Sequence, residues 1–182
     1  MGHLAVCIPD SLVSIPQSSV IRSYFLSELA RICSLYRVDE IIVLHDYTYE
    51  SKSDQFNPSE YMIRNFQYLE TPQYLRKHLF EMHSDLKNAG LMNPIECDHH
   101  LKADEILEFR EGVVIDRPVK SGSGSWVEIG LKQQAKIDYL LPPKTRVTLR
   151  LNNYQDPSPK FYEAEAVSRT QPKLEQSIIG VI

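Results

Sequence analysis

Basic residues gather in the C-terminal half of the chain around its single tryptophan, Trp126. Protein surfaces often hold single-stranded nucleic acid with cations that neutralise phosphates and an aromatic ring that stacks on bases. The candidates for nucleic-acid contact in this segment are Arg110, Trp126, Lys144, Arg146 and Arg150, with Lys120, Lys132 and Lys136 as neighbours. A place for Trp126 in the protein core fits the sequence equally well.

A second group of basic residues follows Thr71 and Pro72. Thr is a favourable N-cap and Pro is tolerated at the first helical position, so this pair predicts the start of a helix. Arg76 and Lys77 then lie close to a helix N-terminus, which attracts phosphate. We predict that both contact RNA; a capped helix with a solvated polar face is the alternative.

The run Cys97-Asp98-His99-His100 contains residue types that bind zinc. A closed zinc site needs four ligands, usually as two pairs, and the other histidines show no complementary spacing. We therefore predict no metal site, and hydrogen-bonding roles for these histidines at a domain junction. The three cysteines form no CxxC pair, so free thiols are expected.

The first elements predicted to position these residues form a parallel β-α-β unit. Leu4 to Ile8 is a continuous apolar run, as expected of a buried parallel strand. Apolar residues spaced by three and four predict a helix from Gln17 to Tyr36, and Val38 to Leu44 predicts the second strand, with Ile42 buried. A helix over 60–69 and a left-handed helix stop at Gly90 complete the pattern.

From Arg110 to Leu151 the pattern changes to short strands separated by Gly, Ser and Pro turns. The predicted strands are Gly112–Ile115, Trp126–Ile129, Ala135–Leu140 and Arg146–Leu151. We predict an α/β fold with a small antiparallel β-barrel inserted into it. The expected domains are 1–98 for the first α/β part, 99–168 for the inserted barrel and 169–182 for a return segment.

Composition limits how the chain can bind its partners. Its 182 residues carry a formal net charge of −4 and a pI near 5.9, so any RNA contact is expected to be a local patch and not a uniformly basic surface. No apolar run reaches the roughly 18 residues that span a bilayer. We expect an intracellular protein, nuclear or cytoplasmic, without membrane contact.

Five stretches, taken in order, resemble the SPOUT (α/β-knot) putative RNA methyltransferases of eukaryotes and archaea. They are LAVCIPDSLVS, SELARICSLYRVDEIIV, QYLETPQYLRKHLF followed by DLKNAGLMNPIECDHHL, FREGVV, and VEIGLKQQAKIDYLLPPKTRVTL. The resemblance implies a SPOUT α/β domain with an OB-like barrel insertion, S-adenosylmethionine as methyl donor and RNA as substrate.

The same resemblance singles out Arg31 as the catalytic candidate. An arginine at this helix position reaches the substrate phosphate or orients the nucleotide at the methyl donor, using its fixed fork of donors. The alternative from the sequence alone is a solvated arginine that pairs with a carboxylate such as Glu28. This chain has Ser27 where SPOUT motifs usually have glycine.

In the SPOUT family the cofactor-binding loops of the knot follow the point where the barrel returns to the α/β core. This sequence ends at Ile182, soon after that point, so we expect an incomplete SPOUT-like domain whose cofactor-binding residues stay unassigned. Two functions remain: a truncated S-adenosylmethionine-dependent RNA methyltransferase, or a non-catalytic RNA- or protein-binding remnant. A family-type homodimer is compatible with the first.

Overall fold

The computed structural model describes residues 2–47, 56–118, 124–156, 159–172 and 175. The chain divides into two compact units. The N-terminal unit comprises Met1–Thr71 and Met82–Asp98, and the barrel unit comprises Pro72–Glu81 and His99–Ile182. Lys120, the Gly/Ser turn at 121–123 and most of the predicted return segment lie outside the described residues.

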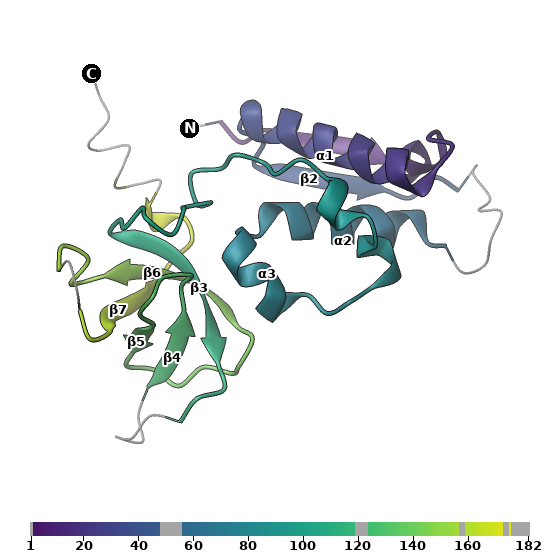
Figure 1. Cartoon of the computed structure of the whole chain (residues 1–182). Coiled ribbons are helices and arrows are strands. Elements are labelled where there is room, and N and C mark those ends of the chain that lie inside the picture. Colours follow the sequence, from purple (N-terminus) through teal and green to yellow (C-terminus); the bar gives the residue numbers. More distant parts are fainter. Residues whose placement is uncertain (1, 48–55, 119–123, 157–158, 173–174, 176–182) are drawn as a thin grey trace. The chain divides into compact units, whose positions relative to one another are not determined.

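The N-terminal unit contains the predicted β-α-β arrangement (Figure 1). Strands β1 (Ala5–Pro9) and β2 (Glu40–Leu44) pair in parallel and are joined by helix α1 (Ser19–Leu35). The other elements of the unit are helix α2 (Pro58–Glu70) and three 3-10 turns, η1 (Asp10–Ser14), η2 (Ser84–Leu86) and η3 (Ala89–Leu91). The parallel pairing is confirmed.

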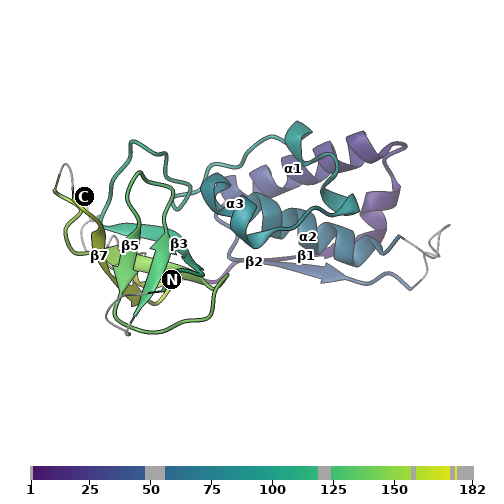
Figure 2. The ribbon, with the colours of Figure 1, turned by 60° about the horizontal axis from the view of Figure 1, so that its bottom comes forward.

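The core of this unit lies on one face of the two-stranded sheet. Both α1 and α2 cover that face (Figure 2), and Val13, Leu26 and Met62 are fully buried there. Ile42 points to the opposite face and is 44% exposed, so the prediction that it is buried was wrong. Successive strand residues alternate between faces, and the described helices cover only one of them.

The barrel unit confirms the predicted small β-barrel as a closed five-stranded structure, while its being an insertion stays a prediction. Its strands follow the order β3-β4-β5-β7-β6 around the barrel. They are β3 (Phe109–Ile115), β4 (Ser125–Glu128), β5 (Ala135–Ile137), β6 (Arg146–Leu151) and β7 (Tyr162–Val167). The barrel is not wholly antiparallel, because β5 and β7 pair in parallel.

Strand β7 was not predicted from the sequence. Its inward residues include Ala164, and two glutamates, Glu163 and Glu165, point outward. The apolar alternation of this strand is therefore weak, although it closes the barrel against β5 and β6. The fully buried barrel core includes Val127, Ile129, Ile137 and Leu149.

Helix α3 (Gln73–Leu79) belongs to the barrel unit. Tyr74 on this helix donates a hydrogen bond to the backbone oxygen of Glu111 on β3, at 2.9 Å. Burial raises the pKa of Tyr74 to about 12. Gly130 lies against the Tyr74 ring with a left-handed φ of +72°, and a Cβ at Gly130 would come within 2.3 Å of that ring.

Two local predictions about helix ends were wrong. Thr71 does not cap α3; its hydroxyl donates to the backbone oxygen of Gln67 at 2.8 Å and ends α2. Gly90 does not adopt a left-handed conformation, since it lies inside η3. None of the described helices is long and apolar enough to cross a membrane.

Candidate nucleic-acid interface

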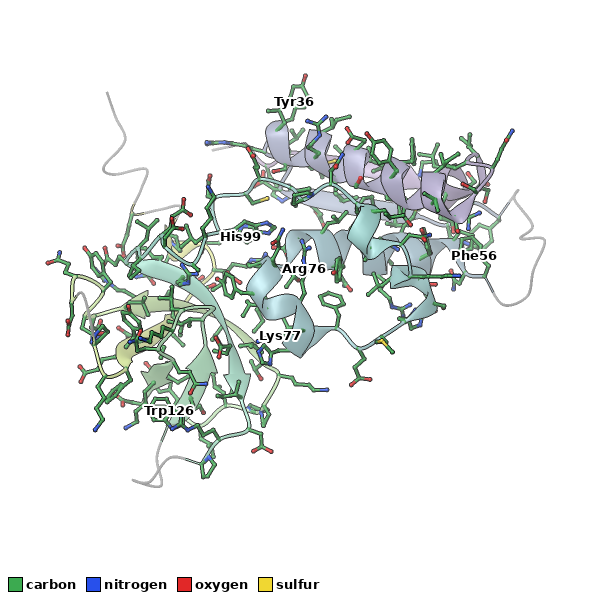
Figure 3. The ribbon with its side chains drawn as sticks, viewed as in Figure 1. Tyr36, Phe56, Arg76, Lys77, His99 and Trp126 are labelled. Atoms are coloured by element: carbon green, nitrogen blue, oxygen red, sulfur yellow. The ribbon has the colours of Figure 1, made fainter. Side chains whose placement is uncertain are left out.

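The outer surface of β4 and β5 carries the most clearly organised aromatic and basic side chains of the barrel. Side chains alternate along β4, so that Val127 is buried while Trp126 is partly exposed. Lys136 on β5 is the register partner of Trp126 and lies on the same outer face. Trp126 is therefore a surface residue of the barrel and not part of its core, which decides between the two sequence-based alternatives (Figure 3).

Two further side chains hold the Trp126 ring. The guanidinium carbon of Arg117 lies over the ring, 4.5 Å from its centroid. Phe161, just before β7, meets the ring edge-on with centroids 5.6 Å apart. We call Trp126, Arg117, Phe161 and Lys136 the Trp126 platform.

Arg117 supplies one of the two positive charges of this platform. Its Nη1 donates a 2.6 Å hydrogen bond to Oε1 of Gln134, and it pairs with no carboxylate in the described part of the chain. The neighbouring Glu128 carboxylate accepts hydrogen bonds from the Gly130 backbone and the Gln134 amide. Among the described residues, no carboxylate therefore compensates the charge of Arg117 beside the partly exposed Trp126 ring, an arrangement that suits RNA.

Sequence reasoning missed Arg117 and Phe161. Arg117 comes two residues after Ile115, and Ile115 pairs with Trp126 across β3 and β4. Extending that register beyond the strand would have placed Arg117 near Trp126. Phe161 lies beside unpredicted β7 and offered no such signal.

Three predicted RNA-binding cations instead form ion pairs within the barrel unit. Lys144 pairs with Glu81 at 2.9 Å, Arg146 with Glu111 at 2.6 Å and Arg150 with Glu108 at 2.6 Å. The hydrogen bond from Lys144 lowers the pKa of Glu81, and the hydrogen bond to Glu108 raises the pKa of Arg150. Their local charges are largely compensated, unlike that of Arg117.

Arg146 also lines a pocket of about 380 Å³ on the barrel unit. The buried Glu111 carboxylate forms part of its wall and accepts hydrogen bonds from Arg146 and from the Thr148 hydroxyl. The complete lining is Glu111, Arg146, Val147, Thr148, Ala166, Val167 and Arg169.

Arg110 was expected on the RNA-binding surface, and this expectation was wrong. It is 2% exposed and donates to the backbone oxygens of Ile129, Glu105 and Lys102 at 2.6, 2.7 and 3.1 Å. Its guanidinium lies 4.8 Å from the centroid of the Tyr74 ring. Burial lowers the pKa of Arg110, and its hydrogen bonds hold the strands and the preceding loop together.

Arg76 and Lys77 lie on α3 as predicted, but not near its start (Figure 3). The helix has only seven residues, and both basic residues lie in its last turn. The argument from a helix N-terminus therefore does not apply to them. Lys77 is exposed and Arg76 is half-buried, and their contact with RNA stays a prediction.

Arg31 lies on the solvent side of α1, with 60% of its side chain exposed. Its Nη2 and Nε donate to the same Glu28 oxygen at 2.8 and 3.3 Å. The other Glu28 oxygen accepts a hydrogen bond from Asn93, and these bonds from Asn93 and Arg31 lower the pKa of Glu28. The structure thus contains the ion pair that the sequence offered as the alternative, while the catalytic role of Arg31 stays a prediction.

The Cys-His segment lies where the two units divide. Cys97 belongs to the N-terminal unit, where its sulfur is 3.2 Å from the Ser34 hydroxyl. His99 and His100 belong to the barrel unit and meet edge-to-face at 4.6 Å. The absence of a metal site stays a prediction. All three cysteines are free, as expected, although Cys7 is exposed.

Comparison with known proteins gives a consistent result. The family model described as "Putative RNA methyltransferase" matches residues 3–180. The 28S rRNA (uridine-N(3))-methyltransferase of Mus musculus is 41% identical over 184 residues, which cover 96% of this chain and 48% of the mouse protein. The human protein of the same name is 40% identical over 184 residues, which cover 96% of this chain and 49% of the human protein. The Drosophila melanogaster protein of that name is 32% identical over 191 residues, which cover 96% of this chain and 39% of the fly protein. The chain thus spans about half the length of the mouse and human relatives.

Proposed function

The chain belongs to the RNA methyltransferase family, and on that premise we propose that it functions in the transfer of a methyl group from S-adenosylmethionine to RNA. The names of the mouse and human relatives point to the N3 atom of a uridine in large-subunit ribosomal RNA as the acceptor. In this proposal the N-terminal unit is part of a SPOUT-type catalytic domain, and the barrel is an OB-like module that holds the RNA.

The Trp126 platform is the main observation that supports RNA binding by the barrel. Base stacking on an exposed aromatic ring tolerates any sequence, and a nearby unpaired guanidinium attracts the phosphate backbone. Trp126 supplies the ring, Arg117 a charge that no described carboxylate compensates, and Lys136 a second cation on the same face. A local patch of this kind is what a chain of net charge −4 needs to bind RNA.

The pocket beside Arg146 is not assigned to the methyl donor. Its lining is of mixed charge, because the Glu111 carboxylate lies in the same wall as Arg146 and pairs with it. The charge of the pocket therefore neither favours nor opposes the sulfonium of S-adenosylmethionine.

Arg31 is the proposed catalytic residue of the N-terminal unit. Glu28 binds the Nε and Nη2 side of its guanidinium, and Nη1, which has no acceptor among the described residues, can donate to a phosphate oxygen of the RNA. Such a pre-oriented guanidinium loses less conformational freedom on binding than a mobile one.

Methyl transfer to RNA tests this proposal. The chain is incubated with tritiated S-adenosylmethionine and protein-free 28S ribosomal RNA, and tritium in the RNA is counted. Any tritium that the wild type incorporates should be lost in Arg31→Ala at an unchanged melting temperature. Glu28→Gln is the control, because it removes the ion pair but keeps the arginine. Wild-type activity in Arg31→Ala would exclude the catalytic role.

The second candidate is a non-catalytic RNA- or protein-binding function that uses the barrel surface. It is favoured by the Trp126 platform, which offers a contact for RNA without a methyl-donor site. Calorimetric titration of the folded chain with S-adenosylmethionine distinguishes the two. Saturable binding favours the enzyme, whereas the absence of heat favours a binding role.

A further inference from the structure

A second stacked arginine lies in the N-terminal unit. The guanidinium carbon of Arg22, in the first turns of α1, is 4.4 Å from the centroid of the Phe56 ring and 5.7 Å from that of the Tyr61 ring. Tyr61 is itself fixed by a 2.7 Å hydrogen bond to the Ser23 hydroxyl. Two aromatic rings therefore hold the Arg22 side chain in one orientation.

Arg22 has no acceptor for its guanidinium in the part of the chain that the structure describes. Its Nε is buried without a hydrogen-bond partner, and the residue forms no ion pair there. Arg64 in the same unit behaves differently, because it pairs with Asp85 at 2.6 Å. Because Nε is buried, a ligand reaches the guanidinium only through its Nη atoms, and these have no carboxylate partner among the described residues.

The position of Arg22 in the fold is one where ligands commonly bind. In sheets of parallel strands, ligands bind beyond the carboxyl ends of the strands. Strand β1 ends at Pro9 and β2 at Leu44, and the connections place the starts of α1 and α2 at this same edge (Figure 1). Phe56, just before α2, lies there too (Figure 3).

The chemistry of this edge suits a nucleic-acid phosphate. The starts of α1 and α2 bring the positive ends of two helix dipoles, which favour anions. The Asp10 carboxylate is occupied by hydrogen bonds from Ser59, His45 and the Asp46 backbone. His45 in turn meets the ring of Tyr47, which is 88% exposed and available for stacking.

We propose that Arg22 is a phosphate-binding residue that contacts the RNA backbone at the carboxyl edge of β1 and β2. The inference rests on the proposed RNA function and adds a contact on the N-terminal unit, separate from the Trp126 platform. Arg22 donates from its Nη atoms to phosphate oxygens, with Phe56 and Tyr61 holding the guanidinium plane.

The salt dependence of RNA affinity tests this contact. The affinity of the full chain for a fluorescein-labelled 12-nucleotide single-stranded RNA is measured by anisotropy at several salt concentrations. Each phosphate contact contributes about 0.7 to the slope of log affinity against log salt for single strands. We expect Arg22→Gln to reduce that slope by about 0.7, and Arg22→Lys to retain more of it because the charge remains. Arg37→Gln is the matched control, since it removes an exposed arginine beyond the other end of α1.

Each outcome separates this inference from the proposed function. An unchanged slope in folded Arg22→Gln, with Trp126→Ala weakening affinity, would overturn the Arg22 contact and leave the RNA function standing. Equal slope losses in Arg22→Gln and Arg37→Gln would also overturn it, because the effect would then be one of net charge. No RNA binding by the wild type would overturn both. Saturable calorimetric binding of inorganic tripolyphosphate by a chain that binds no RNA, lost in Arg22→Gln, would identify a free-anion site and overturn the RNA contact.

Discussion

The two units use their strands in different ways. In the barrel the strands close on themselves, and side chains such as Leu149 and Ile137 are completely buried. In the N-terminal unit two parallel strands are covered by helices on one face, while Ile42 and Leu44 on the other face are 44% and 56% exposed. Parallel sheets are usually covered on both faces. The described residues enclose the core of the barrel, but they cover only one face of the parallel sheet.

Because of this difference, the two units should tolerate side-chain substitutions at different places. A closed barrel fixes its interior tightly and leaves its outer surface available for binding. The half-covered sheet leaves apolar residues in solvent, and their replacement removes little packing. The same type of residue therefore has different importance in the two units.

Core truncation gives the largest expected effect. Leu149→Ala should lower the free energy of unfolding of the barrel by about 2–5 kcal/mol, because it leaves a cavity in a closed core. Ile42→Ala should cost at most about 1 kcal/mol, because its side chain is already half in solvent. Urea unfolding followed by circular dichroism measures both. Equal losses would contradict the comparison between the units.

Removal of the aromatic platform gives the next largest effect. Trp126→Ala should weaken binding of single-stranded RNA by about 1–3 kcal/mol, the usual loss for one stacked base. Fluorescence anisotropy with a labelled oligonucleotide measures this affinity. Tyr36→Ala is the control, since Tyr36 is an exposed aromatic residue of the N-terminal unit. A larger loss in the control would place RNA binding elsewhere.

Ionisation of Tyr74 should make the barrel unit sensitive to high pH. The pKa of Tyr74 is raised by burial from its ordinary value of 10 to about 12, so the folded state resists ionisation. This contribution to stability is complete below about pH 10 and is lost as the pH rises toward 12. Tyr74→Phe should not show that loss at high pH. Near pH 8 it should lower the free energy of unfolding by about 0.5–1.5 kcal/mol, because the hydrogen bond to Glu111 is missing.

Urea midpoints at pH 8 and pH 11 check the Tyr74 prediction. The wild type should lose more stability between the two values than Tyr74→Phe. Identical losses would show that another group controls the alkaline range.

Replacement of a single cation gives the smallest expected effect on RNA binding. Lys144 pairs with Glu81, whereas Arg117 has no carboxylate partner among the described residues. Arg117→Gln should therefore reduce the salt slope of RNA binding by about 0.7, and Lys144→Gln should reduce it less. The slopes come from anisotropy titrations at several salt concentrations. A larger reduction for Lys144→Gln would show that paired cations also contact RNA.

Much of the fold could be predicted from local patterns. The apolar runs of β1 and β2 and the spacing in α1 depend on neighbouring residues, so the β-α-β unit and most barrel strands were predicted. Strand β7 was missed because its alanines give a weak alternation. The exposed face of β2 was missed because strand composition does not tell how many layers cover a sheet.

The candidate site was harder to predict, because charge compensation depends on tertiary contacts. Arg146 and Arg150 stand out in the sequence, but their glutamate partners are 35 and 42 residues away. Arg117 and Arg22 have no such pattern and were found only from their aromatic neighbours. Arg110 shows the converse, since a prominent cation proved to be a buried structural residue.

The central claim is that the barrel holds RNA through the Trp126 platform, and intrinsic fluorescence tests it most directly. Trp126 is the only tryptophan, so its emission reports on the platform without labelling. Titration of the full chain with a single-stranded RNA oligonucleotide should quench that emission in a saturable manner and less strongly at high salt. Binding that is detected by anisotropy but leaves the Trp126 emission unchanged would contradict the claim.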